Sequence, residues 1–329
     1  MSQLAGRLTG VCLFALQLAA CSHNVQSLRL QESAPAGLPP TRELGTTPFF
    51  PQERYQCGPA ALATVLVAND IRTHPDELID KVYLPARQGS VPLEMEAAAR
   101  SYGMLVYPPA PQLEAVVQEI AAGHPVLVLQ NLGLSWWPRW HYAVAMGYDL
   151  TQGEIVLRSG TTRRYTMPMG VFEATWRRGG FWARVIVPAG TFPATAAPLP
   201  YNRAALALEQ SGRETAALQS FHAATERWPD SAVGWLARGN LVYRLERYEE
   251  AEQSFRNGLG AEPANADLWN NLGYALAGRG CTAQAETAVR CAIALRPQVD
   301  NYQESLIELQ GRDTIKSGGA CAPVTCPSR

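Results

Sequence analysis

Residues 49–62 read FFPQERYQCGPAAL, and this stretch decides the fold of the first part of the chain. From Pro59 onward apolar residues recur at helical spacing, which places Cys57 at or just before a helix start. Unpaired N–H groups at a helix start stabilise a thiolate, so the pattern predicts a reactive cysteine with a pKa below the free value of about 8.5. The side-chain amide of Gln52 is a candidate donor to an oxyanion that forms beside this sulfur.

A histidine, His141, stands 84 residues after the cysteine and opens the apolar run 141–148. A cysteine followed much later by a strand histidine is the chain order of papain-like thiol hydrolases. A cysteine of this kind can also be an inert buried group, and a lone strand histidine can be structural. The residues around the pair therefore carry the functional interpretation.

The motifs Gln-x4-Cys-Gly-Pro-Ala-x-Leu and His-Tyr-x-Val-x2-Gly-Tyr-Asp together resemble the peptidase C39-like family over roughly residues 44–187. The resemblance implies a cysteine peptidase in which Cys57 is the nucleophile, His141 the base and Gln52 the oxyanion donor. Two features depart from the family pattern. Gln52 stands five residues before the cysteine instead of six, and Ser159 occupies the position of the family's aspartate. Because a serine supplies no charge to the histidine, a catalytically impaired peptide-binding or scaffold protein is the alternative.

The periodicity upstream of residue 188 indicates helices first and strands afterwards, which is typical of an α+β fold. We expect an α+β papain-like cysteine peptidase domain over 46–187. Trp136, Trp137 and Trp140 precede or flank His141, where they either line a substrate cleft or pack on a sheet edge. The expected helices span 58–69, 75–83, 91–102 and 112–122, and the expected strands span 125–131, 141–148, 154–158, 163–167 and 181–187.

The first twenty residues resemble a secretory signal peptide, with Arg7 before an apolar run that is too short to span a membrane. The run ends in Leu-Ala-Ala-Cys, which resembles the bacterial lipobox and implies lipidation of Cys21. Ser22 follows this cysteine, and its identity implies an outer-membrane lipoprotein on the periplasmic face. An ordinary signal peptide with an incidental cysteine is the alternative. Residues 21–45 are expected to form a flexible tether.

Residues 188–200 contain four prolines and no charged side chain, which predicts a semi-rigid linker. Downstream, similar residues recur every 34 positions, including an early aromatic residue, a small residue four positions later and a closing proline. This period resembles the tetratricopeptide repeat. It implies an all-α solenoid of three repeats and a capping helix over 201–312, whose concave face would bind a protein partner. The recurring sets are Tyr201, Trp235 and Trp269; Ala205, Gly239 and Gly273; Ala217, Ala251 and Ala285; and Pro229, Pro263 and Pro297.

Four cysteines lie near the end of the chain: Cys281, Cys291, Cys321 and Cys326. An even number in an oxidising compartment suggests disulfides with three possible connectivities, of which a local Cys321–Cys326 bridge is the simplest. Their spacing does not fit a zinc site. The tail 313–329 shows no periodicity and is expected to be disordered unless its cysteines are bridged.

The chain has 329 residues, 47% of them hydrophobic, which is enough for two domains with separate cores. A formal net charge of −1 without a basic stripe argues against a nucleic-acid partner. No Gly-x4-Gly-Lys motif occurs, so we expect no ATP dependence, and no other cofactor is expected. The expected substrate is a peptide or protein, and hydrolysis of a cell-wall amide is a third reading of the same site.

Overall fold

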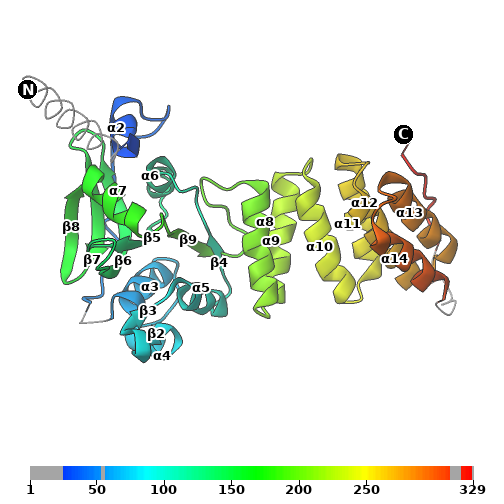
Figure 1. Cartoon of the computed structure of the whole chain (residues 1–329), viewed down its shortest axis with the longest axis horizontal. Coiled ribbons are helices and arrows are strands. Elements are labelled where there is room, and N and C mark those ends of the chain that lie inside the picture. Colours follow the sequence, from blue (N-terminus) through cyan, green and yellow to red (C-terminus); the bar gives the residue numbers. More distant parts are fainter. Residues whose placement is uncertain (1–24, 53–55, 312–319, 328–329) are drawn as a thin grey trace, which may run out of the picture. The chain divides into compact units, whose positions relative to one another are not determined.

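The computed structural model describes residues 25–52, 56–311 and 320–327 (Figure 1). The described chain forms two compact units. The first unit holds the described residues up to Tyr102, Val106–Val187 and Pro193–Thr195. The second holds Gly103–Leu105, Pro188–Phe192 and the described residues from Ala196 onward.

A seven-stranded sheet, most of whose residues belong to the first unit, has the order β4-β9-β5-β6-β7-β8, with β1 paired to β6. Strands β5, β6, β7 and β8 form an antiparallel meander, and β9 pairs antiparallel with β5. The five predicted strands are present, and they are joined by β1 and β4, which were not predicted. The strands span Thr41–Glu43 (β1), Met104–Tyr107 (β4), Val126–Asn131 (β5), Trp140–Asp149 (β6), Glu154–Ser159 (β7), Thr162–Pro168 (β8) and Ala183–Pro188 (β9).

Helices precede most of the sheet in the chain, as expected of the predicted α+β class. The four predicted helices are present, and a helix that was not predicted, α7, follows β8. A short two-stranded sheet of β2 and β3 lies between α4 and α5 in the chain. The elements span Cys57–Val67 (α3), Pro75–Val82 (α4), Tyr83–Leu84 (β2), Pro85–Arg87 (η1, a 3-10 turn), Gly89–Ser90 (β3), Pro92–Ser101 (α5), Leu113–Ala121 (α6) and Met169–Arg178 (α7).

Helix α3 is the buried helix of the first unit. Its residues from Gly58 to Leu66 are all buried, and the helix packs against β5 and β6. A helix that is apolar around its whole circumference must be enclosed by the protein, which is how the alanine-rich sequence after Pro59 places it. The first residue of this enclosed helix is Cys57.

The prediction of a flexible tether over 21–45 is wrong for the described part of that segment. Residues Val25–Glu32 form helix α2, and residues Thr41–Glu43 form β1 on the edge of β6. The buried carboxylate of Glu173 accepts hydrogen bonds from the backbone N–H groups of Gln26 (3.2 Å) and Ser27 (2.8 Å). A carboxylate satisfies the free N–H groups at a helix start, and this contact fixes α2 on the domain.

The described residues of the second unit form seven helices at regular intervals along the chain, which confirms the predicted all-α repeat class (Figure 1). The first helix of each pair begins 34 residues after the one before it. The last helix, α14, corresponds to the predicted capping helix. The helices span Pro198–Gln210 (α8), Glu214–Arg227 (α9), Ala232–Arg244 (α10), Tyr248–Ala261 (α11), Ala266–Gly278 (α12), Thr282–Leu295 (α13) and Asp300–Gln310 (α14).

The recurring small residues of the repeats allow the two helices of a pair to approach closely. A Cβ atom added to Gly239 would lie 2.4 Å from the ring of Phe255, and one added to Gly273 would lie 2.5 Å from Val289. The recurring tryptophans have a second role. The indole N–H of Trp235 donates to the carbonyl of Pro229 (2.9 Å), and the next repeat carries the same bond between Trp269 and Pro263 (2.8 Å).

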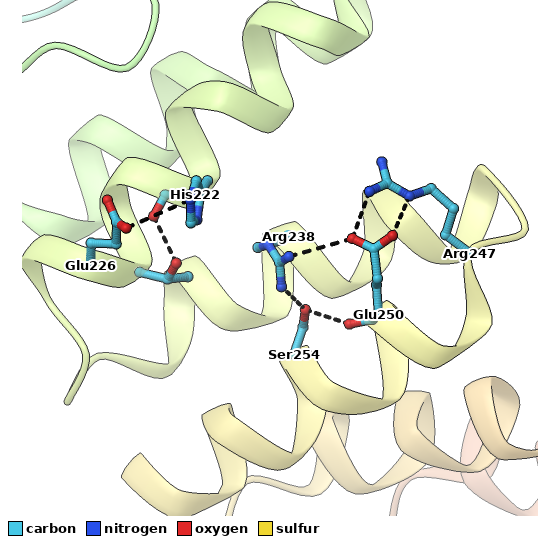
Figure 2. A network of polar contacts seen from close by, with 7 residues as sticks. His222, Glu226, Arg238, Arg247, Glu250 and Ser254 are labelled. Carbon is cyan, nitrogen blue, oxygen red and sulfur yellow. Dashed lines mark hydrogen bonds and ion pairs between the residues drawn. The ribbon is translucent and has the colours of Figure 1, made fainter.

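A polar network joins α10 to α11 within the second repeat, as Figure 2 shows. Arg238 donates to Ser254 Oγ (2.6 Å) and lies 3.6 Å from the carboxylate of Glu250. Arg247 binds the same carboxylate through two hydrogen bonds of 2.6 Å. Because Glu250 is partly exposed, each of these ion pairs contributes little to stability, about 0–1 kcal/mol.

The predicted Cys321–Cys326 bridge is wrong. The disulfides join Cys281 to Cys321 and Cys291 to Cys326, so both bridges connect the end of the chain to α13 or its N-cap. Residues 320–327 are held against the repeats in this way, and Arg256 also donates to the carbonyls of two of them. A local pairing looked simplest by sequence distance, but the hydrophobic core of the repeats takes up Cys321, Cys281 and Cys291.

Candidate active site

One pocket of the first unit, about 960 Å³ in volume, contains the residues that the sequence singled out. It is bounded by the start of α3, by the turn from η1 to α5 and by the start of β6. Cys57, His141 and Gln52 all line it. The other lining residues are Arg87, Gln88, Gly89, Ser90, Val91, Pro92, Leu129, Pro138, Arg139, Trp140, Tyr142 and Gly160.

Cys57 is the first residue of α3, where the sequence placed it, and it is the free cysteine of the described residues. Burial raises the pKa of the Cys57 thiol, and hydrogen bonds with the backbone of Tyr142, Gly58 and Cys57 itself act against that rise without cancelling it. The expectation of a pKa below the free value is therefore wrong for the resting site. The helix start favours the thiolate, but the enclosure of α3 disfavours any charge there more strongly.

His141 is the second residue of β6, and its Nε2 atom lies 2.8 Å from Ser159 Oγ at the end of β7. Because Ser159 occupies Nε2, Nδ1 is the ring nitrogen that remains to accept a proton from the thiol. Burial, and then the positive charge of Arg139, lower the pKa of His141 to about 4. The imidazole is therefore neutral at pH 7 and can accept a proton.

No hydrogen bond joins Cys57 to His141 in the described residues. The thiol is instead bound by the backbone of Tyr142, the residue next to His141. The two groups thus face one pocket as a neutral thiol and a neutral imidazole. Catalytic hydrogen bonds are often long before the substrate binds and shorten in the complex.

Gln52 lies in the pocket with a fixed amide orientation. Its Oε1 atom accepts from the backbone N–H of Gly160 (2.9 Å), and its Nε2 atom donates to the carbonyl of Tyr142 (3.3 Å). An amide nitrogen has two hydrogens, so one remains for a substrate oxygen. The spacing of five residues to Cys57 does not prevent Gln52 from lining the same pocket.

Two polar residues of the neighbouring strand positions, Asn131 and Asp149, form their hydrogen bonds within the described residues with groups other than His141. Asn131 accepts hydrogen bonds from the backbone of Gly133 and Arg139 (2.9 Å each) and so shapes the loop before β6. Asp149 lies at the far end of β6, where its carboxylate accepts from the backbone of Gln152. Ser159 therefore occupies the third position of the site, with no carboxylate in its place.

The three tryptophans near His141 are not part of a packed sheet edge. Trp136 and Trp137 are 77% and 69% exposed and contact each other edge to face, with ring centres 6.3 Å apart. Trp140 lines the pocket and is 56% exposed. For Trp140 the structure therefore supports a place in the wall of the cleft instead of packing on a sheet edge.

Sequence reasoning missed three pocket residues: Arg87, Ser90 and Arg139. The Ser90 hydroxyl is buried without a hydrogen-bond partner among the described residues, and a Cβ atom added to Gly58 would lie only 2.1 Å from it. The glycine after the cysteine therefore leaves space for Ser90. The Cys-Gly-Pro order was the available signal of this close approach, but it did not reveal which residue comes near.

The second unit has a groove of its own, about 620 Å³ in volume, which lies along the first helices of successive repeats. Asn202, Asn240 and Asn271 line it from α8, α10 and α12. Asn271 donates to Asn240 (2.8 Å), and the buried Oδ1 atom of Asn202 has no hydrogen-bond partner in the part of the chain that the structure describes. Leucine, valine, tyrosine and phenylalanine side chains form most of the remaining surface.

Comparisons with known proteins agree with this division. Residues 45–183 match the Peptidase_C39 like family, and residues 202–257 and 236–300 match the tetratricopeptide repeat. The chain therefore contains a C39-like peptidase domain. That domain is followed by tetratricopeptide repeats, and this is the combination that the two sequence patterns resemble.

Solved structures similar to this chain include a C39-like peptidase and tetratricopeptide domains. A C39-like peptidase from Bacillus anthracis is 17% identical, with a TM-score of 0.38 and coverage of 45% of this chain and 97% of that one. The second tetratricopeptide domain of human RPAP3, in complex with an HSP70 peptide, is 14% identical (TM-score 0.33; 35% and 100% covered). The Arabidopsis OM64 tetratricopeptide domain is 17% identical (TM-score 0.32; 34% and 93% covered). Among curated proteins none matches the chain.

Proposed function

We propose that the first unit is a cysteine peptidase that hydrolyses peptide amide bonds. The observation that carries this proposal is the shared pocket, in which Cys57 at a helix start faces the same space as His141, whose Nε2 is held by Ser159. A nucleophile, a base and a group that orients the base are the three parts such a site needs.

In the proposed reaction, His141 accepts the thiol proton at Nδ1, and the sulfur attacks the carbonyl carbon of the substrate. The oxyanion receives hydrogen bonds from the free N–H of the Gln52 amide and from the backbone N–H of Cys57. His141 then protonates the leaving amine as the C–N bond breaks. Water hydrolyses the resulting thioester, which releases the acid product and restores the thiol.

The resting thiol and imidazole are both neutral, and this has a consequence for the reaction. Proton transfer from Cys57 to His141 must coincide with substrate binding, because burial opposes a separated thiolate and imidazolium. A substrate that fills the pocket excludes water and brings the reacting groups closer.

The test is labelling and hydrolysis with matched variants. A thiol-directed electrophile should modify Cys57 in the folded protein, as mapped by mass spectrometry, and His141→Gln should slow the modification. Cys57→Ala should abolish hydrolysis of a peptide library and leave the thermal unfolding temperature unchanged within about 2 °C. Equal loss of stability and hydrolysis in that variant would instead assign Cys57 a structural role.

A second candidate is a peptide-binding or scaffold protein that has lost hydrolysis. The observation in its favour is the neutral partner of His141, since Ser159 cannot stabilise an imidazolium by charge. Binding of peptides by the wild-type chain without their cleavage, together with unmodified Cys57, would support this candidate over the peptidase.

We also propose that the repeats bind a protein partner through the groove lined by Asn202, Asn240 and Asn271. Side-chain amides can bond both the N–H and the C=O of an extended peptide, and the apolar remainder of the groove can bury its side chains. Replacing Asn240 and Asn271 by alanine should release a partner that co-purifies with the wild-type protein. A partner retained by the double variant would have to bind elsewhere.

The proposed location is the periplasmic face of the outer membrane, through lipid on Cys21. That residue lies outside the described residues, and the support is the lipobox-like sequence that precedes it. No helix among the described residues is long and apolar enough to span a bilayer. Cys21→Ser should move the protein from the membrane fraction to the soluble fraction. Retention of the variant on membranes washed with high salt would contradict lipidation.

A further inference from the structure

Two arginine side chains at the pocket have no part in the proposed reaction. Arg87 ends the turn η1, and Arg139 lies two residues before His141, so the two approach the pocket from different elements. Both are exposed, and in the part of the chain that the structure describes neither side chain forms an ion pair or a hydrogen bond. A guanidinium group presents several N–H donors in a planar fork that matches a carboxylate.

The positive charge of these two residues is not matched at the pocket. None of the described residues that line it is an aspartate or a glutamate. Glu96, on α5, is already paired with Arg100 and Arg184 at 2.7 Å each. Glu94 acts on the buried hydroxyl of Tyr142 and does not line the pocket. An anionic group that enters would therefore meet two cations and no acid from the described lining.

An apolar surface lies beside this charge. Trp140 follows Arg139 directly, lines the pocket and is 56% exposed, and Pro138 precedes the same arginine. In the segment that carries Arg87, Val91 and Pro92 also line the pocket, at the start of α5. The pocket thus combines two guanidinium groups with apolar walls. This combination suits an extended polypeptide better than a small free anion.

We propose that this pocket selects polypeptides with an aspartate or glutamate close to the bond that is cut, and that Arg87 and Arg139 bind the acidic side chain. The proposal rests on the peptidase function argued above and adds the class of substrate to it. Arg87 and Arg139 are specificity-determining residues in this account and take no part in bond breaking.

The charge of the substrate would also change the tendency of His141, the catalytic base, to accept a proton. Burial and then the charge of Arg139 make the imidazolium form of His141 unfavourable in the resting site. A carboxylate bound to Arg139 offsets its repulsion, so His141 can take the thiol proton more readily once an acidic substrate is in place. Acidic substrates should therefore have a higher kcat as well as a lower KM.

The test compares pairs of fluorogenic peptides that differ only in Glu or Gln at one position, scanned on both sides of the cleaved bond. For the full chain we expect the Glu member to have a kcat/KM about ten- to a hundredfold higher at its best position, because two arginine side chains can bind the one carboxylate through charge-assisted hydrogen bonds. The preference should shrink as salt is added. Arg139→Gln and Arg87→Gln should remove most of it.

Matched controls separate a specific effect from a general loss of positive charge. Arg72→Gln changes an exposed arginine of the same unit that does not line the pocket, and it should keep the full preference for Glu. Arg139→Glu should invert the preference toward peptides with Lys at that position. Equal kcat/KM for the Glu and Gln peptides in the wild-type chain would overturn the proposal.

A binding measurement distinguishes failure of this proposal from failure of the peptidase function. Calorimetry with Cys57→Ala should show tighter binding of the Glu peptide than of the Gln peptide, and Arg139→Gln in that background should equalise them. Preferential binding without hydrolysis by the wild type would overturn the peptidase function and support acidic recognition. Hydrolysis without preferential binding would overturn acidic recognition alone.

Discussion

At the scale of single residues, burial controls the state of the candidate site. It raises the pKa of Cys57 and lowers that of His141, so the two residues are neutral together. At rest a neutral thiol of this kind is alkylated more slowly than a thiolate would be. Its reactivity should rise when a ligand changes the surroundings of His141, instead of being permanently high as in a preformed thiolate–imidazolium pair.

The titration of His141 can be measured directly. Its folded pKa of about 4 lies below the ordinary value of about 6.5. The unfolded chain therefore binds more protons between these values, and the free energy of unfolding should fall as pH drops from about 6.5 to about 4. NMR should give a midpoint near pH 4 for the ring protons, and Arg139→Gln should raise it. A midpoint near 6.5 in the wild type would contradict the burial of the ring.

Ser159 offers a second test at this scale. Ser159→Ala removes one neutral hydrogen bond to His141 and should reduce kcat by less than about tenfold, since such a bond contributes about 0.5–1.5 kcal/mol. Ser159→Asp should raise hydrolysis or leave it unchanged, because a carboxylate favours the imidazolium that forms during catalysis. Loss of hydrolysis in a folded Ser159→Asp variant would mean that the hydroxyl does more than orient the ring.

At the scale of elements, the start of α3 depends on one close contact. Gly58 leaves space for Ser90, because an added Cβ atom would lie 2.1 Å from the hydroxyl oxygen and 2.5 Å from the Cβ of that serine. The contact ties the helix that carries Cys57 to the short strand β3. The geometry of the nucleophile is therefore set by packing behind it as well as by the helix itself.

This contact predicts a compensating pair of variants. Gly58→Ala should destabilise the first unit by about 1–3 kcal/mol, since overpacking a buried site forces its neighbours to move. Adding Ser90→Gly should recover part of that loss, as measured by chemical denaturation. Ser90→Gly alone is the control. If Gly58→Ala is as stable as the wild type, α3 can shift freely, and the contact does not position Cys57.

The elements also explain which parts of the structure could be predicted from the sequence. Helix α3 and the repeat helices follow from local periodicity, and each confirmed prediction concerned such a pattern. Helix α7 was missed because it follows directly on strand β8 at Pro168, although Phe172 and Trp176 are buried at helical spacing. The contacts of α2 with Glu173 join residues 146 and 147 positions apart, and no local pattern reveals them.

The candidate site was predictable to a similar extent. Cys57, His141, Gln52 and Ser159 were identified by motif and spacing, and the structure brings the first three into one pocket with Ser159 bonded to His141. The direction of the thiol pKa shift was not predictable, because a helix start is visible in the sequence but its enclosure by strands is not. Arg87 lies about fifty residues from Arg139 in the chain, so only the fold brings both to the pocket.

At the scale of the whole molecule, the cysteines are divided between the units by chemical role. The free thiol of Cys57 belongs to the first unit, and both disulfides lie in the second. The bridges close loops across 40 and 35 residues between the end of the chain and α13 or its N-cap. An oxidising compartment can therefore stabilise the repeats while the peptidase domain keeps a reduced thiol.

Reduction of the bridges tests this division. Reducing both disulfides should lower the stability of the repeats by about 2–5 kcal/mol and expose residues 320–327 to hydrogen exchange. The first unit should retain its unfolding temperature and its labelling at Cys57. Replacement of Cys321 and Cys326 by serine is the matched variant that needs no reductant. A parallel loss of stability in the first unit would show that the two units do not respond independently.

The docking of α2 against Glu173 would limit the distance between the C39-like domain and a membrane if the chain is lipid-anchored as proposed. If Cys21 carries lipid, the chain from that residue to Val25 spans at most about 14 Å, even fully extended. Val25 and Leu28 are exposed apolar side chains three positions apart on α2, close to where the lipid would enter the bilayer. A domain held so closely would act on polypeptides at the membrane surface. It would not reach polypeptides farther out in the periplasm. The short segment between Cys21 and Val25 would then make proximity to the membrane, as well as sequence, a condition for a polypeptide to be a substrate.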